Sequence, residues 1–140
     1  MIAALAPDQR ASLAAHELGV LIVDDDPILL MDMAQSLADA GIIVFEARNA
    51  NEALQVLSTR TDVRMTITDV DMGDGGLNGF QLAKVVATRW PAMSLLIVSG
   101  QSRPKATDLP EGARFLAKPC APSSLIGNVF ALVAQQSGSI

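Results

Sequence analysis

Short apolar runs alternate with longer segments of helical pattern along this chain. The runs are rich in Val, Ile and Leu and stop abruptly at polar residues, which is typical of buried strands. The runs predict five strands, at about residues 20–23, 43–47, 65–68, 95–98 and 114–117. The segments between them predict helices at about residues 27–40, 49–57, 80–89 and 122–134. Strands alternating with helices predict an α/β domain with a parallel sheet covered on both faces.

Several helix ends carry local signals. Asp26 suits an N-cap and Pro27 the first helical position, while Gly41 suits the position just after the same helix. Asn49 and Glu52 have the spacing of a capping box. These signals indicate that the first two helices begin where the apolar pattern places them.

The segment between the fourth and fifth strands has the weakest pattern. It contains Pro104 and Pro110, which leave room for about one or two helical turns. We therefore expect a short or irregular fourth helix.

The expected strand order is 2-1-3-4-5. In this arrangement the order reverses between the first and third strands, and ligands bind there, beyond the carboxyl ends of the strands.

Composition narrows the class of protein. The 140 residues suffice for one domain, and 50% hydrophobic content supports a sizeable core. The net charge is −5 with no basic run, so we expect no nucleic-acid partner. A span of roughly 20 apolar residues is missing, so we expect no membrane insertion. The single cysteine, Cys120, cannot form an internal disulfide, so we expect a reducing, cytoplasmic compartment. We expect an N-terminal extension at residues 1–18, the domain at 19–135 and a frayed tail at 136–140.

Five aspartates follow two of the predicted strands. The run at 20–23 stops at Asp24, Asp25 and Asp26, and the run at 65–68 stops at Asp69, with Asp71 close behind. Two carboxylates about 4 Å apart repel by roughly 4 kcal/mol at an effective dielectric of about 20. If the two runs are neighbouring strands, this cluster must hold protons or bind a cation. Asp26 is the exception, because capping the next helix already explains it.

Two further polar residues end predicted strands. Ser99 closes the fourth strand before Gly100, and Lys118 closes the fifth strand before Pro119. At this point the chain resembles the receiver domains of two-component response regulators, over about residues 19–134. The matching pieces occur in the family's order: Val23-Asp24-Asp25, Thr68-Asp69-Val70-Asp71-Met72, Asn78-Gly79, Ser99-Gly100 and Lys118-Pro119. The resemblance implies a flavodoxin-like (βα)5 fold with a doubly wound parallel sheet.

The resemblance also implies a chemistry. Asp69 would be the phosphoacceptor, taking a phosphoryl group from a histidine kinase or a histidine phosphotransfer protein. Mg²⁺ would be bound by the side chains of Asp25 and Asp69 and by the backbone carbonyl of Asp71, with Asp24 acting through water. A carboxylate is a usable nucleophile for phosphoryl groups. The implied protein is a phosphoacceptor that can promote its own phosphorylation and dephosphorylation, and is otherwise not an enzyme.

Three other residues receive implied roles. Lys118 would pair with the incoming phosphoryl group, and its bond to Pro119 would be cis. Ser99 would hydrogen-bond a phosphoryl oxygen after transfer. Phe115 matches the family's switch aromatic, so Ser99 and Phe115 together would form a switch. A static core position for Phe115 is an equal alternative.

The chain also departs from the family pattern. Gly73 stands where the family usually has proline, and the loop that follows is lengthened by Asp74, Gly75 and Gly76. The stretch from Ser99 to Lys118 is shorter than usual. These departures indicate a divergent subgroup whose output surface differs from the usual one. We expect a single-domain type, because little chain follows the last predicted helix.

Three functions remain open from the sequence. The first is a phosphorylated signalling module that works by protein contact, or as a sink for phosphoryl groups. The second is a receiver-like docking module that is never phosphorylated. The third is a Mg²⁺-dependent phosphatase with an aspartate nucleophile, suggested by the D-x-D spacing of Asp69 and Asp71. A homodimer through the fourth and fifth strands and the last helix is also left open, and the downstream partner is unknown.

Overall fold

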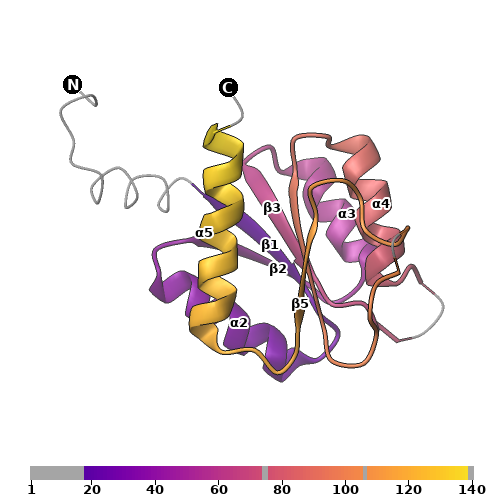
Figure 1. The fold of residues 1–140 in the computed structure, drawn as a ribbon, viewed down its shortest axis with the longest axis horizontal. Helices are drawn as coiled ribbons and strands as arrows, with labels where there is room; N and C mark the ends of the chain where they lie inside the picture. Colours follow the sequence, from indigo (N-terminus) through magenta and orange to yellow (C-terminus); the bar gives the residue numbers. More distant parts are fainter. Residues whose placement is uncertain (1–17, 74–75, 106, 139–140) are drawn as a thin grey trace.

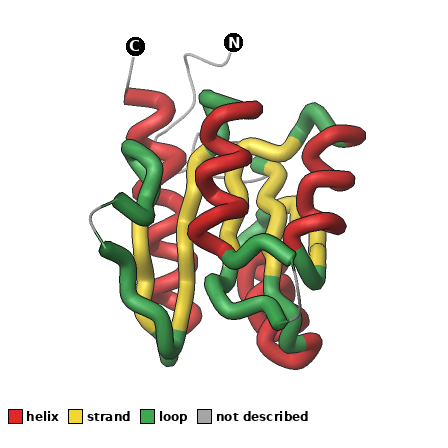
Figure 2. The backbone as a smooth tube through the Cα atoms, turned by 90° about the vertical axis from the view of Figure 1, so that its right-hand side faces the viewer, coloured by secondary structure: helices red, strands yellow, loops and turns green. Residues whose placement is uncertain are grey.

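The computed structural model describes residues 18–73, 76–105 and 107–138. These residues form a three-layer α/β/α domain in which a parallel sheet lies between two pairs of helices (Figures 1 and 2). The strands are β1 (Gly19–Val23), β2 (Ile43–Ala47), β3 (Val63–Thr68), β4 (Ser94–Ser99) and β5 (Arg114–Ala117). The helices are α2 (Pro27–Asp39), α3 (Ala50–Thr59), α4 (Gly79–Arg89) and α5 (Pro122–Gly138).

The sheet has the order β2-β1-β3-β4-β5, with every neighbouring pair parallel. The predicted flavodoxin-like topology is thereby confirmed. Val23 pairs with Ala47 on one side and with Thr68 on the other. The backbone N–H of Asp69 continues the pairing by donating to the carbonyl of Val23 at 2.9 Å. This register brings the residues that follow β1 and β3 to one edge of the sheet.

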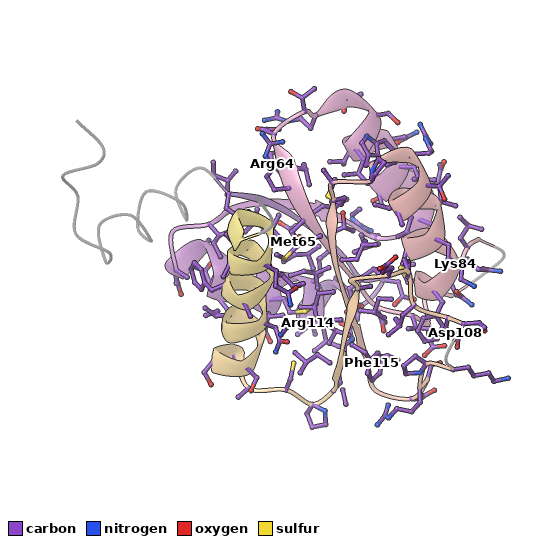
Figure 3. The ribbon with its side chains drawn as sticks, turned by 45° about the horizontal axis from the view of Figure 1, so that its top comes forward. Arg64, Met65, Lys84, Asp108, Arg114 and Phe115 are labelled. Atoms are coloured by element: carbon purple, nitrogen blue, oxygen red, sulfur yellow. The ribbon has the colours of Figure 1, made fainter. Side chains whose placement is uncertain are left out.

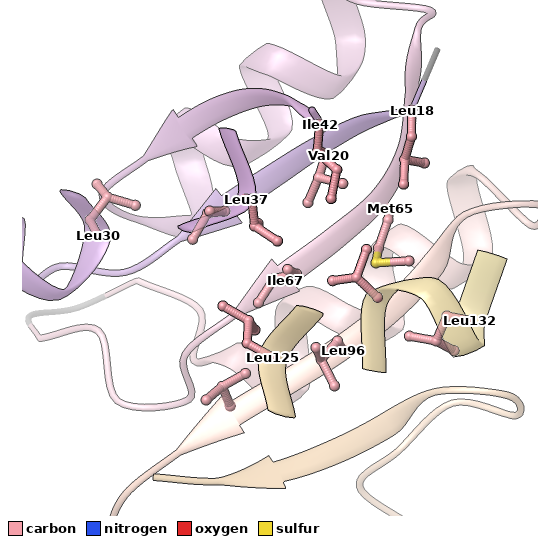
Figure 4. Close-up of a cluster of buried hydrophobic side chains, with 13 residues drawn as sticks. Leu18, Val20, Leu30, Leu37, Ile42, Met65, Ile67, Leu96, Leu125 and Leu132 are labelled. Carbon is pink, nitrogen blue, oxygen red and sulfur yellow. The ribbon is translucent and has the colours of Figure 1, made fainter. Parts of the chain in front are cut away.

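Each face of the sheet has its own apolar cluster. Val20 and Ile22 of β1 point into the cluster beneath α2 and α5, which Figure 4 shows, whereas Leu21 and Val23 point into the cluster beneath α3 and α4. All five residues of β1 are buried. Burial of one such aliphatic side chain contributes about 1.5–3 kcal/mol, so the continuous apolar runs are explained by a sheet covered on both sides.

The predicted helix starts are confirmed where the signal was local. Asp26 caps α2 by accepting from the N–H groups of Ile28 at 2.9 Å and Leu29 at 3.3 Å. Gly41 follows α2 with a φ of 88°, a left-handed conformation that glycine adopts without strain.

The caps of the next two helices differ from the prediction in detail. Asn49 caps α3, but Glu52 reaches back to the N–H of Arg48 at 2.9 Å, one residue before the cap. A complete capping box occurs instead at α4, where Asn78 and Gln81 bond each other's backbone.

The connection from β4 to β5 takes the irregular form expected from its prolines. The described residues between Gly100 and Ala113 contain turns and no helix. One turn is closed by Asp108, whose carboxylate accepts from the N–H of Lys105 at 2.6 Å. Proline removes a backbone donor and clashes within a helix, which explains why no regular helix forms here.

The two ends of the domain also differ from expectation. Helix α5 continues to Gly138, so residues 136–138, which we expected to fray, are helical. No proline interrupts this stretch, and glutamine is a good helix former. At the other end, Leu18 is buried in the α2/α5 cluster, while the rest of the expected extension lies outside the described residues. Within the described residues no helix has both the length and the apolar character to cross a bilayer.

Candidate functional site

Three carboxylates converge at the carboxyl edge of the sheet. Asp24 and Asp25 follow β1, and Asp69 follows β3. One oxygen from each of the three lies within 4.8 Å of the others. Asp24 is fully buried, Asp69 is partly buried and Asp25 is exposed. The three carboxylates therefore line a shallow site, called the mouth below, which is open to solvent at Asp25 and closed at Asp24.

Lys118 joins this cluster from the end of β5. Its Nζ lies 2.9 Å from Oδ2 of Asp24 and 3.7 Å from Oδ1 of Asp69. The lysine side chain is 18% exposed and the Asp24 side chain 0%. A buried carboxylate is costly unless it is paired, so Asp24 and Lys118 stabilise each other's charged forms. The Lys118–Pro119 peptide bond is cis, as predicted.

The electrostatics of the cluster favour a bound cation. Burial raises the pKa of Asp69, and the charges of Asp24 and Asp71 add to this, although Lys118 opposes it. Burial alone would lower the pKa of Lys118, but its hydrogen bond to Asp24 and the charges of Asp24 and Asp69 together raise it. One ammonium faces three carboxylates, which leaves an excess of negative charge. This donor set fits Mg²⁺, which takes one or two carboxylates with waters in octahedral geometry.

Backbone donors hold two of the carboxylates in place. Oδ1 of Asp24 accepts from the N–H of Asp26 at 2.9 Å, and Oδ1 of Asp69 accepts from the N–H of Val70 at 2.8 Å. Within the described residues, Oδ2 of Asp69 has no hydrogen-bond partner. One oxygen of Asp69 is thus oriented by the protein while the other remains available for chemistry.

Asp71 and Ser99 are linked through a residue that the sequence did not single out. Oγ of Ser102 lies 3.1 and 3.0 Å from the two carboxylate oxygens of Asp71. The backbone N–H of Ser102 donates to Oγ of Ser99 at 3.3 Å, and Ser99 is fully buried. Nothing in the local pattern marked Ser102, because it lies in the segment with the weakest periodicity.

Two glycines shape the wall of the site. Gly73 has a φ of 77°, which proline with its φ near −65° does not adopt, so the usual family residue would not fit this turn. A Cβ added at Gly73 would lie 3.3 Å from Oδ2 of Asp25. At Gly79, a Cβ would collide with the backbone carbonyl of Asp69. The start of α4 therefore packs directly against the Asp69 backbone. Of the inserted residues, Asp74 and Gly75 lie outside the described part.

Phe115 is the second residue of β5, the strand that ends one residue before Lys118 (Figure 3). It is partly buried and packs against the cluster beneath α3 and α4. The guanidinium carbon of Arg103 lies 5.8 Å from the centre of its ring, within the range of a cation–π contact. Its position suits either a moving or a static side chain, so its switch role stays a prediction.

The comparisons with known proteins agree with this geometry. The family model of the response regulator receiver domain matches residues 20–130. The chain therefore belongs to the response regulator receiver family, whose members generally bind Mg²⁺ at an acidic pocket and act as phosphoacceptor modules of two-component systems.

Relatives and solved structures support the same family. The chain is 30% identical over 111 residues to the putative two-component response regulator ARR21 of Arabidopsis thaliana and 32% identical over 84 residues to a putative response regulator NtrX-like protein of Rickettsia felis. These matches cover 78% and 60% of this chain, but only 18% of either relative. A response regulator receiver protein from Sinorhizobium medicae superposes with a TM-score of 0.79 at 27% identity, covering 85% of this chain and 96% of that one.

Proposed function

We propose that this chain accepts a phosphoryl group on Asp69, with Mg²⁺, from a histidine kinase or a histidine phosphotransfer protein in the cytoplasm. It then signals by protein contact or drains phosphoryl groups from a shared kinase. The single observation that carries the proposal is the partly buried carboxylate of Asp69, placed between two further carboxylates and the ammonium of Lys118.

The chain's own residues suit the transfer. Oδ2 of Asp69 attacks the phosphorus of the partner's phosphohistidine, a P–O bond forms, and the P–N bond breaks with its electron pair returning to the imidazole. Lys118, 3.7 Å from Oδ1 of Asp69, stabilises the charge on the phosphoryl oxygens. Asp25 and Asp69, with the backbone carbonyl of Asp71, would hold Mg²⁺, which would supply the remaining neutralisation of charge. Ser99 then donates its hydroxyl to a phosphoryl oxygen.

A surface beside the mouth supports the approach of a partner. Ile28 and Met31, in the first turns of α2, are 66% and 60% exposed. A separate hollow of about 550 Å³ between α2 and the start of α5 is lined by Met33, Leu125 and Lys118, among others. An exposed apolar patch of this kind marks an interaction surface. We assign the hollow to the helix of the partner that carries the phosphohistidine, because Lys118, one of its lining residues, lies 3.7 Å from Oδ1 of Asp69.

The test is to mix the protein with Mg²⁺ and a small phosphodonor, beside the variant Asp69→Asn. We expect intact-mass spectrometry to show one added phosphoryl group on the wild type and none on the variant. When Mg²⁺ is chelated, we expect no phosphoryl group to be added to either protein. Equal labelling of Asp69→Asn would remove Asp69 from the role of nucleophile.

The same experiment separates the two other candidates. Absence of labelling by any donor, together with binding to a kinase, would support the docking-only module. Sustained turnover of a small phosphoester by the purified protein would support the phosphatase. Neither is favoured by a specific contact in the described residues, whereas the pairing of Lys118 with Asp24 and Asp69 favours phosphoryl acceptance.

A further inference from the structure

Ser102 connects two parts of the site that are far apart in sequence. Its hydroxyl lies between both oxygens of Asp71, which follows β3, at 3.0 and 3.1 Å. Its backbone N–H bonds Oγ of Ser99, the last residue of β4, at 3.3 Å. A hydroxyl donates one hydrogen at a time, so the two short distances describe a single donor shared by the carboxylate. Ser102 therefore bridges the ends of β3 and β4 across the mouth.

The next residue carries the connection to β5. Nη1 of Arg103 donates to the carbonyls of Gly100 and Ser102, each at 3.3 Å, which folds the segment onto itself. The guanidinium of Arg103 lies over the ring of Phe115. A continuous path of contacts thus runs from Ser99 through Ser102 and Arg103 to Phe115. Because no helix forms after β4 in the described residues, this irregular segment occupies the space beside the site.

We propose that Ser102 is a positioning residue that latches residues 100–105 to Asp71 and Ser99, so that occupancy of Asp69 is passed to the contact between Arg103 and Phe115. The latch in the free protein follows from the contacts above, and its effect on the response to occupancy rests on the proposed function. Movement of Ser99 Oγ toward a group on Asp69 pulls on the N–H of Ser102. The bond from Ser102 to Asp71 resists that pull, so the latch sets how far the segment moves.

The experiment is NMR on the full chain, comparing wild type with Ser102→Ala and Ser102→Thr. Backbone order of residues 100–105 is measured in the free protein, and the resonances of Arg103 and Phe115 are followed on addition of Mg²⁺ and beryllofluoride. We expect Ser102→Ala to open the segment about fivefold more often, the effect of losing one hydrogen bond of average strength. We also expect it to enlarge the beryllofluoride-induced shifts of Arg103 and Phe115, because the bond that resists the pull of Ser99 is gone while the backbone N–H bond to Ser99 is kept. Threonine keeps the hydroxyl and should restore both readouts.

Two controls keep the outcome decisive. Ser58→Ala removes an exposed hydroxyl near the opposite end of the sheet and should change neither readout. Ser102→Ala should still gain one phosphoryl group, because Ser102 does not touch the nucleophile. Wild-type order together with wild-type shifts in Ser102→Ala overturns the latch. If the wild type itself binds no beryllofluoride, the proposed function fails, and the free-protein comparison alone decides whether the latch exists: unchanged order overturns it.

Discussion

The middle of the sheet and its carboxyl edge are built on opposite principles. In the middle, Ile22, Ile67 and Leu96 are fully buried in the apolar cluster on one face, and Leu21, Val23 and Ile97 are fully buried in the cluster on the other. One or two residues further along, the chain delivers carboxylates that burial and mutual repulsion make unfavourable, as the raised pKa of Asp69 shows. The comparison teaches that the apolar middle of the sheet supplies the stability of this domain. That stability compensates for the unfavourable grouping of carboxylates at the carboxyl edge.

The edge is further divided between a regular and an irregular side. The turn from β1 into α2 is short and capped by Asp26. The connection from β4 to β5 is held by single contacts such as those of Ser102 and Arg103. Segments with few buried apolar contacts open at low free energy. We therefore expect conformational response on the β4–β5 side and rigidity on the β1 side.

The largest expected effect comes from the middle of the sheet. Ile67→Ala should lower the free energy of unfolding by about 2–5 kcal/mol, because it leaves a cavity in a fully buried position. Ile43→Ala, at a site 45% exposed on the edge strand β2, is the control and should cost well under about 1.5 kcal/mol. Urea unfolding measures both. Similar losses in the two variants would contradict the division between interior and surface.

A smaller effect is expected where the interior meets the edge. Gly79→Ala places a methyl group against the carbonyl of Asp69, so α4 must shift, at a cost of about 1–3 kcal/mol. We also expect slower phosphorylation, because the shift displaces the backbone of Asp69, the proposed phosphoacceptor. Gly127→Ala is the matched control: its added Cβ meets no atom within 4 Å, and in a helix it should stabilise by up to about 1 kcal/mol. Thermal unfolding and intact-mass labelling give the two readouts. An unaltered Gly79→Ala protein would show that the close approach is dispensable.

A substitution at Thr66 should change the free energy of unfolding without affecting the carboxylate site. Its Oγ1 is buried in β3 without a hydrogen-bond partner, an exception among the described residues. Thr66→Val keeps the shape and removes the unpaired hydroxyl, so we expect a gain of about 1 kcal/mol in the free energy of unfolding. Labelling of Asp69 should be unchanged. A loss of stability would mean that the hydroxyl finds a partner in solution.

The smallest expected effect on the free energy of unfolding comes from removing the charge of Asp69. Its folded pKa is raised by burial, so its contribution to stability is full below the ordinary carboxyl pKa and is lost as pH rises through the folded value. Without divalent cations, Asp69→Asn should therefore be more stable than wild type at pH 7, and the difference should vanish below about pH 4. Urea midpoints across this pH range test the sign. Added Mg²⁺ should stabilise the wild type more than the variant. A variant less stable at pH 7 would contradict the predicted penalty.

The sequence by itself determined the elements and the place of the acids. Apolar runs of strand length, the cap at Asp26 and the glycine at position 41 act through neighbouring residues, so their pattern is legible locally. Parallel strands align their carboxyl ends, so the strand pattern alone predicts that Asp24 and Asp69 lie together. The roles assigned to these residues remain proposals, but their proximity is a property of the fold.

The tertiary structure decided which side chains meet. Lys118 bonds Asp24 across 94 positions, and Ser102 bonds Asp71 across 31. Neither distance nor partner is encoded in a local period, because these contacts depend on how the sheet twists and how a segment without regular structure lies over its edge. The same holds for the approach of Gly79 to Asp69. Local propensity therefore specified the scaffold, whereas packing between distant segments specified the contacts of Ser102 beside Asp69.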